Sequence, residues 1–530
     1  MCRFVAVRMY GAYKLQVIPV TVSKLSVLLI CTAMAFPLQF GITLPNVLVY
    51  LFVLCAIGLA IQRRYFSALS NIPGPFWASI TRLWNVWYIV KGDHNLRLID
   101  LHAKHGHFVR LSPDEVSISH PDGPRVVLQA LLRKSDWYRI FSLPDYRYRA
   151  PQAELDPKTK IKRSKLFLSG FSLSHLLKSE EHFDRNIERL LEWMNKHAQE
   201  HRPMHLDKFF SYAAFDNAGE AVFSQSFGFL EKGEDVGGSI QNSRYLNRYL
   251  GIAGYAYWLH VLLVANPIMT WTGILPLGHV FHTSKAALEK RRKDPGARFD
   301  IIAHWLKTQK ERPDQLSDRN IEAQATLSVA AGSDTLSCSL QSFVYHLLRH
   351  PVFWQRAQAE IKDAQSQGRC TGRVVSYHDS QQLPFLQACI HESLRIYGPS
   401  PFGLARIAPE GGITIGETYF PKGTILSINP QVMQKSEACW GPDVNEFKPD
   451  RWMDGEIAAR YKHMLVFGMG YNRCPGEHLA YLQISKIAAT IVRDYSIRQV
   501  DPEQKWTIET YLNCVPHSWP VYIQKLGEKA

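Results

Sequence analysis

The sequence has no two cysteines in a CxxC spacing, although nine cysteines are spread along its 530 residues. An odd number of widely separated cysteines argues against a disulfide framework and for a reducing compartment, so a special cysteine should be a ligand or a nucleophile. Glycine is also scarce, with 33 residues, which excludes a collagen-like chain, and the 46% hydrophobic content excludes a disordered one. The length fits one large domain or two to three average ones.

Acidic residues are absent from the first 70 residues, and residues 25–61 carry no charged side chain of either sign after Lys24. A membrane-spanning helix needs about 20 apolar residues, and residues 42–61 supply them before Arg63 and Arg64. The run begins too late and is too long for a cleaved signal peptide. We therefore expect a membrane anchor over residues 1–70, with one span at 42–61, and a catalytic domain over residues 71–530.

The orientation of this anchor has two interpretations. Arg63 and Arg64 favour the cytosol for the chain that follows, yet the four basic residues before position 25 favour the same side, so a hairpin turning near Pro45 stays open. Residues 249–284 are largely uncharged, and we expect them to form helices on the membrane surface. The net charge of +14 suits a membrane surface, an acidic protein or nucleic acid equally well.

The pattern after residue 71 is mostly helical. Helical periodicity covers residues 183–197, 321–349, 351–366 and 383–397. Strand-like pieces follow at residues 413–415, 419–420 and 424–428. The sequence therefore predicts a fold that is mainly α with a small β portion.

Residues 467–476 read F-G-M-G-Y-N-R-C-P-G. Their glycines allow a tight turn that approaches a flat ligand closely. Pro475 suits the first turn of a helix, so we expect Cys474 at the N-cap, where the helix dipole would lower its pKa. A thiolate held in this way is a good ligand for haem iron. The alternative is a structural cysteine buried in a glycine-rich turn.

This segment resembles the cysteine loop of the cytochrome P-450 family, the haem-thiolate monooxygenases. The family pattern FxxGxRxCxG is matched by Phe467, Gly470, Cys474 and Gly476, and Asn472 stands where the family usually has arginine. Three further motifs of the family occur in its order: A-G-S-D-T at 331–335, E-S-L-R at 392–395 and F-K-P-D-R-W at 447–452. The resemblance implies the cytochrome P-450 fold from about residue 71 onward. Residues 226–230 and 266–268 further resemble the ascomycete pisatin-demethylase-like group.

The A-G-S-D-T motif is a weak helix former in the middle of a long helical segment, which is typical of a functional site. Gly332 leaves room for a small ligand beside the helix. Thr335 can relay a proton or bond the carbonyl one turn back, and Asp334 can deliver protons from solvent. We therefore expect Asp334 and Thr335 to be catalytic, and the alternative is a packing kink with a satisfied threonine.

Glu392 and Arg395 lie three residues apart, on one face of a helix. The resemblance pairs them with Arg451 in a buried structural triad that holds the chain leading to the cysteine loop. A surface ion pair is the alternative.

Haem carries two propionates, and the resemblance assigns Arg406 to them. Lys160 and Ser164 stand where the family usually has aromatic and basic residues, so we expect at most a contact from Lys160. Because Asn472 supplies no charge, Arg406 should carry an unusually large share of propionate binding, and Arg473 is the alternative. The other basic residues of 158–165 are expected to be solvated or to meet the acidic face of a reductase.

The sequence thus predicts a haem-thiolate monooxygenase that inserts one oxygen atom from dioxygen into an apolar organic substrate, in fungal secondary metabolism. The expected cofactor is haem b, with NADPH acting through a separate NADPH-cytochrome P-450 reductase because the chain has no GxGxxG fingerprint. Membrane lipid is an expected partner and nucleic acid is not. The expected location is the endoplasmic reticulum membrane, with the catalytic domain in the cytosol. A haem-thiolate isomerase or dehydratase, and a non-catalytic haem-binding membrane protein, are the alternatives.

Overall fold

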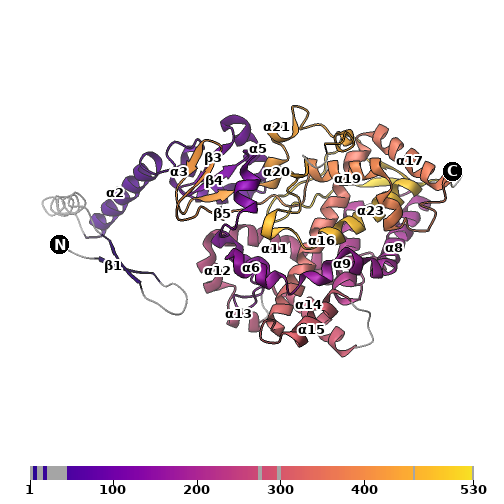
Figure 1. Ribbon diagram of the computed structural model, residues 1–530, viewed down its shortest axis with the longest axis horizontal. Helices are drawn as coiled ribbons and strands as arrows, with labels where there is room; N and C mark the ends of the chain where they lie inside the picture. The colour runs from indigo at the N-terminus through magenta and orange to yellow at the C-terminus, as the bar shows by residue number, and fades with distance from the viewer. Residues whose placement is uncertain are drawn as a thin grey trace. The chain divides into compact units, whose positions relative to one another are not determined.

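The computed structural model describes residues 4–8, 16–20, 44–272, 277–294, 300–456 and 460–527. These residues fall into two compact units, Met1–Ser70 and Asn71–Ala530 (Figure 1). In the first unit, strand β1 (Phe4–Arg8) pairs antiparallel with β2 (Gln16–Val20).

Helix α2 (Leu44–Tyr65) is the main element of the first unit. Its residues Pro45–Tyr65 are long and apolar enough to cross a membrane, and no other helix in the described part of the chain is. The helix continues through Arg63 and Arg64, beyond the expected end of the apolar run, because arginine is a good helix former. The first arm of the alternative hairpin falls on residues 21–43, outside the described residues.

The second unit is built mainly from helices, as the sequence predicts. Its longer helices are α4 (Leu83–Lys91), α5 (His94–His105), α6 (Pro157–Ser164), α8 (Glu180–Gln199), α9 (Leu206–Phe223), α11 (Ser239–Ala253), α12 (Tyr257–Leu263), α13 (Pro267–Thr272), α14 (Leu277–Lys293), α15 (Ile301–Glu311), α16 (Asp318–Leu348), α17 (Pro351–Ser366), α19 (Pro384–Ile396) and α23 (Glu477–Asp494). Shorter ones are α3 (Phe76–Ile80), α7 (Leu173–Leu176), α10 (Phe229–Lys232), α18 (Tyr377–Gln381), α20 (Pro430–Met433) and α21 (Glu437–Trp440). The four predicted helices are confirmed as α8, α16, α17 and α19, with ends that differ by at most three residues.

Helix α16 runs through the middle of this unit and packs against α9, α14, α19 and α23 (Figure 1). It begins with a capping box, in which the Ser317 side chain accepts a hydrogen bond from the backbone of Asn320 and the Asn320 side chain accepts one from the backbone of Ser317. Because most of its side chains are buried, α16 is a core helix, and a change in its shape is felt on both sides of the domain.

The largest sheet has the strand order β3-β4-β8-β5. Its strands are β3 (Phe108–Ser112), β4 (Glu115–Ile118), β8 (Ile425–Ser427) and β5 (Arg406–Ile407). Strands β4 and β8 are parallel and the other neighbours antiparallel, so the sheet joins an early segment of the domain to the segment that carries Arg406. Two further antiparallel pairs are β6 (Ile413–Ile415) with β7 (Thr418–Phe420) and β9 (Tyr495–Gln499) with β10 (Val521–Lys525). The three predicted strand pieces are thereby confirmed as β6, β7 and β8.

Candidate functional site

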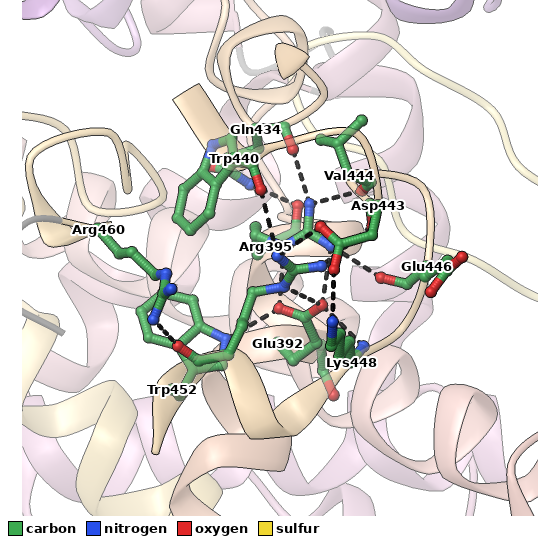
Figure 2. Close-up of polar contacts among 12 residues, drawn as sticks. Glu392, Arg395, Gln434, Trp440, Asp443, Val444, Glu446, Lys448, Trp452 and Arg460 are labelled. Atoms are coloured by element: carbon green, nitrogen blue, oxygen red, sulfur yellow. Dashed lines mark hydrogen bonds and ion pairs between the residues drawn. The ribbon is translucent and has the colours of Figure 1, made fainter. Parts of the chain in front are cut away.

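A buried network of charges anchors the segment that leads to the cysteine loop (Figure 2). The side chains of Glu392 and Arg395 on α19 are fully buried and form an ion pair at 2.8 Å. Arg451 donates to the same carboxylate from Nε at 2.9 Å, and the Trp452 indole donates to its other oxygen at 2.9 Å. Burial acts to raise the pKa of Glu392, but Arg395 and Arg451 outweigh it and hold that pKa below its ordinary value. The predicted triad is therefore present and buried, and the surface-pair alternative is wrong.

Cys474 lies in an extended stretch before α23. The N-cap of α23 is Gly476 and the helix begins at Glu477, so the prediction that Cys474 is the N-cap is wrong. The reason is local: Arg473 has an extended backbone, and the Cys474 N–H donates to the Phe467 carbonyl at 2.8 Å, which keeps the loop bent past the cysteine.

The environment of the Cys474 thiol also differs from the expectation. Its side chain is exposed only to the cavity that it lines, inside densely packed protein. Burial raises the pKa of the Cys474 thiol to about 11, and the opposing hydrogen bond with Gly476 does not compensate. The expected lowering by the protein alone is wrong, because the helix begins two residues too late. A bound metal cation, by contrast, deprotonates a coordinating thiol directly.

Gly470 is required by a neighbouring segment. Its φ of +65° lies in the left-handed region, and a Cβ atom would stand 2.2 Å from the Leu128 carbonyl oxygen. Gly470 therefore lets the cysteine loop pack on the turn that contains Leu128, which is a closer constraint than the flat ligand that the sequence suggested.

A cavity of about 320 Å³ joins the cysteine loop to α16. Phe467, Cys474 and Gly476 line it from the loop, and Gly332 and Thr335 line it from the helix. The structure thus brings together two motifs that are about 140 residues apart in the sequence. A Cβ atom on Gly332 would meet nothing closer than 3.8 Å, so the missing side chain leaves space that belongs to the cavity.

Thr335 and Asp334 face different surroundings. The Thr335 hydroxyl donates to the Ala331 carbonyl at 2.7 Å, which is the bond one turn back that the sequence suggested. Asp334 is 5% exposed, and one of its oxygens accepts hydrogen bonds from Ser243 at 2.7 Å and Asn247 at 2.5 Å, both on α11. Burial raises the pKa of Asp334 above its ordinary value. The carboxylate therefore reaches its surroundings through α11 and not through open solvent.

The two predicted propionate residues are both buried. Arg406 on β5 is 1% exposed, and its Nε has no hydrogen-bond partner. Lys160 on α6 is 7% exposed, lines the cavity and donates to the Tyr471 carbonyl. Burial, and then the charge of Arg406, lower the pKa of Lys160 to about 8. Ser164, four residues on, also lines the cavity.

Arg473, the alternative to Arg406, is committed elsewhere. Its guanidinium forms two hydrogen bonds with Glu477, at 2.6 and 2.8 Å, and its side chain is largely exposed. Asn472 also lines the cavity, and its side-chain oxygen is buried without a partner.

Sequence reasoning misses two groups at this site. Lys134 is fully buried beside Arg406, and burial followed by the charge of Arg406 lowers its pKa to about 6. Ser243 and Asn247, the partners of Asp334, are the second group. Neither group carries a local signal, because Lys134 follows an arginine in an ordinary polar stretch and α11 has no motif.

Comparisons with known proteins agree with this geometry. The family described as Cytochrome P450 matches residues 74–519. The chain is 31% identical over 494 residues to the cytochrome P450 monooxygenase pkfB of Emericella nidulans, an alignment that covers 90% of this chain and 95% of that protein. It is 30% identical over 452 residues to hepC of Aspergillus oryzae (81% and 88%) and 28% identical over 463 residues to gsfF of Penicillium aethiopicum (84% and 92%), both also named cytochrome P450 monooxygenases.

The match to the family extends over most of the chain, and these fungal relatives are aligned nearly end to end. They support a monooxygenase role, and the family binds haem iron through a cysteine thiolate. The subgroup assignment to pisatin-demethylase-like proteins stays a prediction. The expected fold class and family are confirmed, and the chain belongs to the cytochrome P450 family.

Proposed function

We propose that this protein is a membrane-anchored haem-thiolate monooxygenase that inserts one oxygen atom from dioxygen into an apolar substrate of fungal secondary metabolism. The single observation that carries the proposal is the shared cavity, which Cys474 lines together with the Gly332–Thr335 turn of α16. A thiol ligand on one wall and a helix with a side-chain gap on the other suit a planar cofactor with room for a small molecule above it.

The residues around the cavity fit haem b. Cys474 Sγ would hold the iron, with Phe467, Gly470 and Gly476 shaping the loop around it. Arg406 and Lys160 would hold the propionates, and the unpartnered Nε of buried Arg406 supports an anionic guest. When bound, the haem supplies the reductive activation of dioxygen, with electrons that come from NADPH through a separate reductase.

The chain's own part in the chemistry is to move protons to the cavity. Thr335 presents its hydroxyl there, and Asp334 lies one residue away with its carboxyl on Ser243, which also lines the cavity. Because burial raises the pKa of Asp334, this carboxyl can hold a proton at a pH where an exposed aspartate is ionised. A proton can then pass from the Asp334 carboxyl through the Ser243 and Thr335 hydroxyls.

The substrate is apolar because the cavity wall away from the cysteine is mostly aliphatic and aromatic. Its members include Phe141, Leu246, Leu250, Leu327, Phe402 and Leu512. Asn247 and Asn513 add a polar spot on the same wall, where Asn513 donates to Asn247 at 3.3 Å. A largely apolar molecule with one polar group matches this lining.

The membrane attachment has two parts in this proposal. Helix α2 anchors the chain in the endoplasmic reticulum membrane, and Arg63 and Arg64 at its end keep the domain in the cytosol. Helices α12 and α13 present exposed apolar side chains, among them Trp258 at 71% and Trp271 at 87% exposure. These side chains support the expected surface contact of residues 249–284, through which a lipid-dissolved substrate would arrive.

The test is spectroscopic and enzymatic. The reduced carbon-monoxide complex of the full-length protein should show the shifted band of a thiolate ligand, and Cys474→Ala should lack it. Turnover of a candidate substrate should require both NADPH and added reductase, which separates a monooxygenase from an isomerase and from a haem carrier. Persistence of the thiolate band in Cys474→Ala would refute the ligand assignment.

The roles of Asp334 and Thr335 need a separate test. Thr335→Ala should keep haem and substrate binding, but should divert NADPH-derived electrons to hydrogen peroxide. Thr335→Ser, which keeps the hydroxyl, is the matched control. If Thr335→Ala forms the same amount of product per NADPH as the parent, Thr335 has no part in proton delivery.

A further inference from the structure

Three buried cations gather between β5, α6 and the segment before residue 136. Lys134, Lys160 and Arg406 are 0%, 7% and 1% exposed. Lys134 and Arg406 stand opposite each other in an isolated antiparallel bridge, and the Ser135 N–H donates to the Ala405 carbonyl at 3.3 Å. The segment around Lys134 therefore extends the sheet at β5 and brings a second cation next to Arg406.

These cations have only neutral partners among the described residues. Lys134 Nζ donates to the Gln152 carbonyl at 2.6 Å, and Lys160 donates to the Tyr471 carbonyl. Arg406 donates to the Ala405 carbonyl at 3.2 Å and to the Tyr138 hydroxyl at 3.4 Å.

The nearby acids are occupied. Glu154 accepts a hydrogen bond from Arg163 at 3.0 Å, and Asp156 caps α6 through Thr159. Buried charges are normally paired, so a cluster of three cations without a carboxylate indicates a guest that brings about two negative charges.

The cluster is tied to the cysteine loop. The Tyr471 hydroxyl donates to the Leu132 carbonyl at 2.6 Å, two residues before Lys134, and the Arg406 guanidinium lies 5.2 Å from the centre of the Tyr471 ring. The loop itself contributes no free cation to this place, because Asn472 is neutral and Arg473 is bonded to Glu477. A charge that the family usually supplies from position 472 is thus available here only from outside the loop.

We propose that Lys134 is a third propionate-binding cation, which replaces the arginine missing at position 472. This proposal rests on haem being the ligand of the proposed function. Lys134 would act as a positioning residue: its ammonium, together with Arg406 and Lys160, neutralises the two propionates and so holds the haem against Cys474. Hydrogen bonds to charged groups are the strong ones, and losing one should show directly in haem retention.

The experiment measures haem transfer from the full-length haem-loaded protein to an excess of haem-free globin. Lys134→Met, which keeps the length of the side chain but not its charge, should release haem about ten- to a hundredfold faster than the parent. Lys134→Arg should stay within about threefold of the parent rate, because it keeps the charge and the donors. The matched control is Lys158→Met, since Lys158 is an exposed lysine on α6 and its loss should leave the rate unchanged.

A second readout separates charge pairing from a merely structural role. The propionate bending mode in resonance Raman spectra of the ferric protein should shift in Lys134→Met and stay in place in Lys158→Met. Lys134→Gln serves if the methionine variant does not accumulate, and it should also shift the mode. Unchanged transfer, or faster transfer with an unmoved propionate mode, would overturn the proposal. A parent protein that carries no haem would instead overturn the proposed function itself.

Discussion

Removing the charge of Glu392 should destabilise the catalytic domain severely, because this one buried carboxylate holds several chain segments together. It accepts hydrogen bonds from Arg395 at 2.8 and 2.9 Å, from Arg451 at 2.9 Å, from the Trp452 indole at 2.9 Å and from the Lys448 backbone at 2.9 Å. In Glu392→Gln the new amide N–H₂ would face a guanidinium, which has no acceptor. Arg395 would lose its only carboxylate among the described residues, whereas Arg451 would keep Asp443 at 3.1 Å.

The expected cost is about 3–5 kcal/mol, because breaking a buried pair leaves an uncompensated charge. That is a large part of the roughly 5–15 kcal/mol that typically separates folded from unfolded protein, so much of the variant should be recovered without haem. Urea unfolding, followed by the absorbance of the bound haem, gives the difference. The control is Glu311→Gln, whose partner Lys307 lies 3.9 Å away with both side chains mostly exposed, and it should change stability by less than about 1 kcal/mol. If the two variants unfold within about 1 kcal/mol of each other, the reasoning about the buried triad is refuted.

Three further predictions concern the loop, a buried histidine and the anchor. Gly470→Ala should greatly reduce the yield of haem-loaded protein, since its Cβ would lie 2.2 Å from a backbone oxygen, whereas Gly423→Ala, at φ +84° with open space around it, should cost only about 1–2 kcal/mol of left-handed strain. Burial lowers the pKa of His346 to about 3, so the unfolded chain takes up a proton first and stability is lost as pH falls from 6.5 towards 3; the loss should be about 2 kcal/mol at pH 5, and the urea midpoint of His346→Phe should fall less between about pH 7.5 and 5 than that of the parent. Deleting residues 1–70 should release much of the protein from membranes at high salt, while the exposed side chains of α12 and α13 hold back a fraction; complete retention would assign the anchor to those helices.

The motifs carry most of what the sequence can predict. Cys474 and its neighbours, the A-G-S-D-T motif and the triad residues are all recognisable by spacing, because their backbone and charge requirements leave few alternatives at each position. The long helices are predictable for a similar reason, since their apolar periodicity covers many residues. Helix ends are less certain: Pro475 suggests a helix start that the bend at Arg473 delays to Glu477.

Electrostatic surroundings cannot be read from the sequence. The loop pattern predicts a lowered pKa for the Cys474 thiol, and burial raises it instead, because desolvation depends on what packs around a group and not on its neighbours in the chain. The same holds for Asp334, whose partners come from α11, about 90 residues away.

The sequence by itself determined the family, the thiolate loop, the order of the motifs and the apolar segment at 44–65, because each is a local pattern of residue types. Only the tertiary structure decided which groups meet in space. It placed Lys134 beside Arg406 by sheet pairing, committed Arg473 to Glu477 and left Asn472 without a charge to offer. Pairing across a sheet and burial in a core are properties of the whole fold, so they fix the charge around the site in a way that no single segment can reveal.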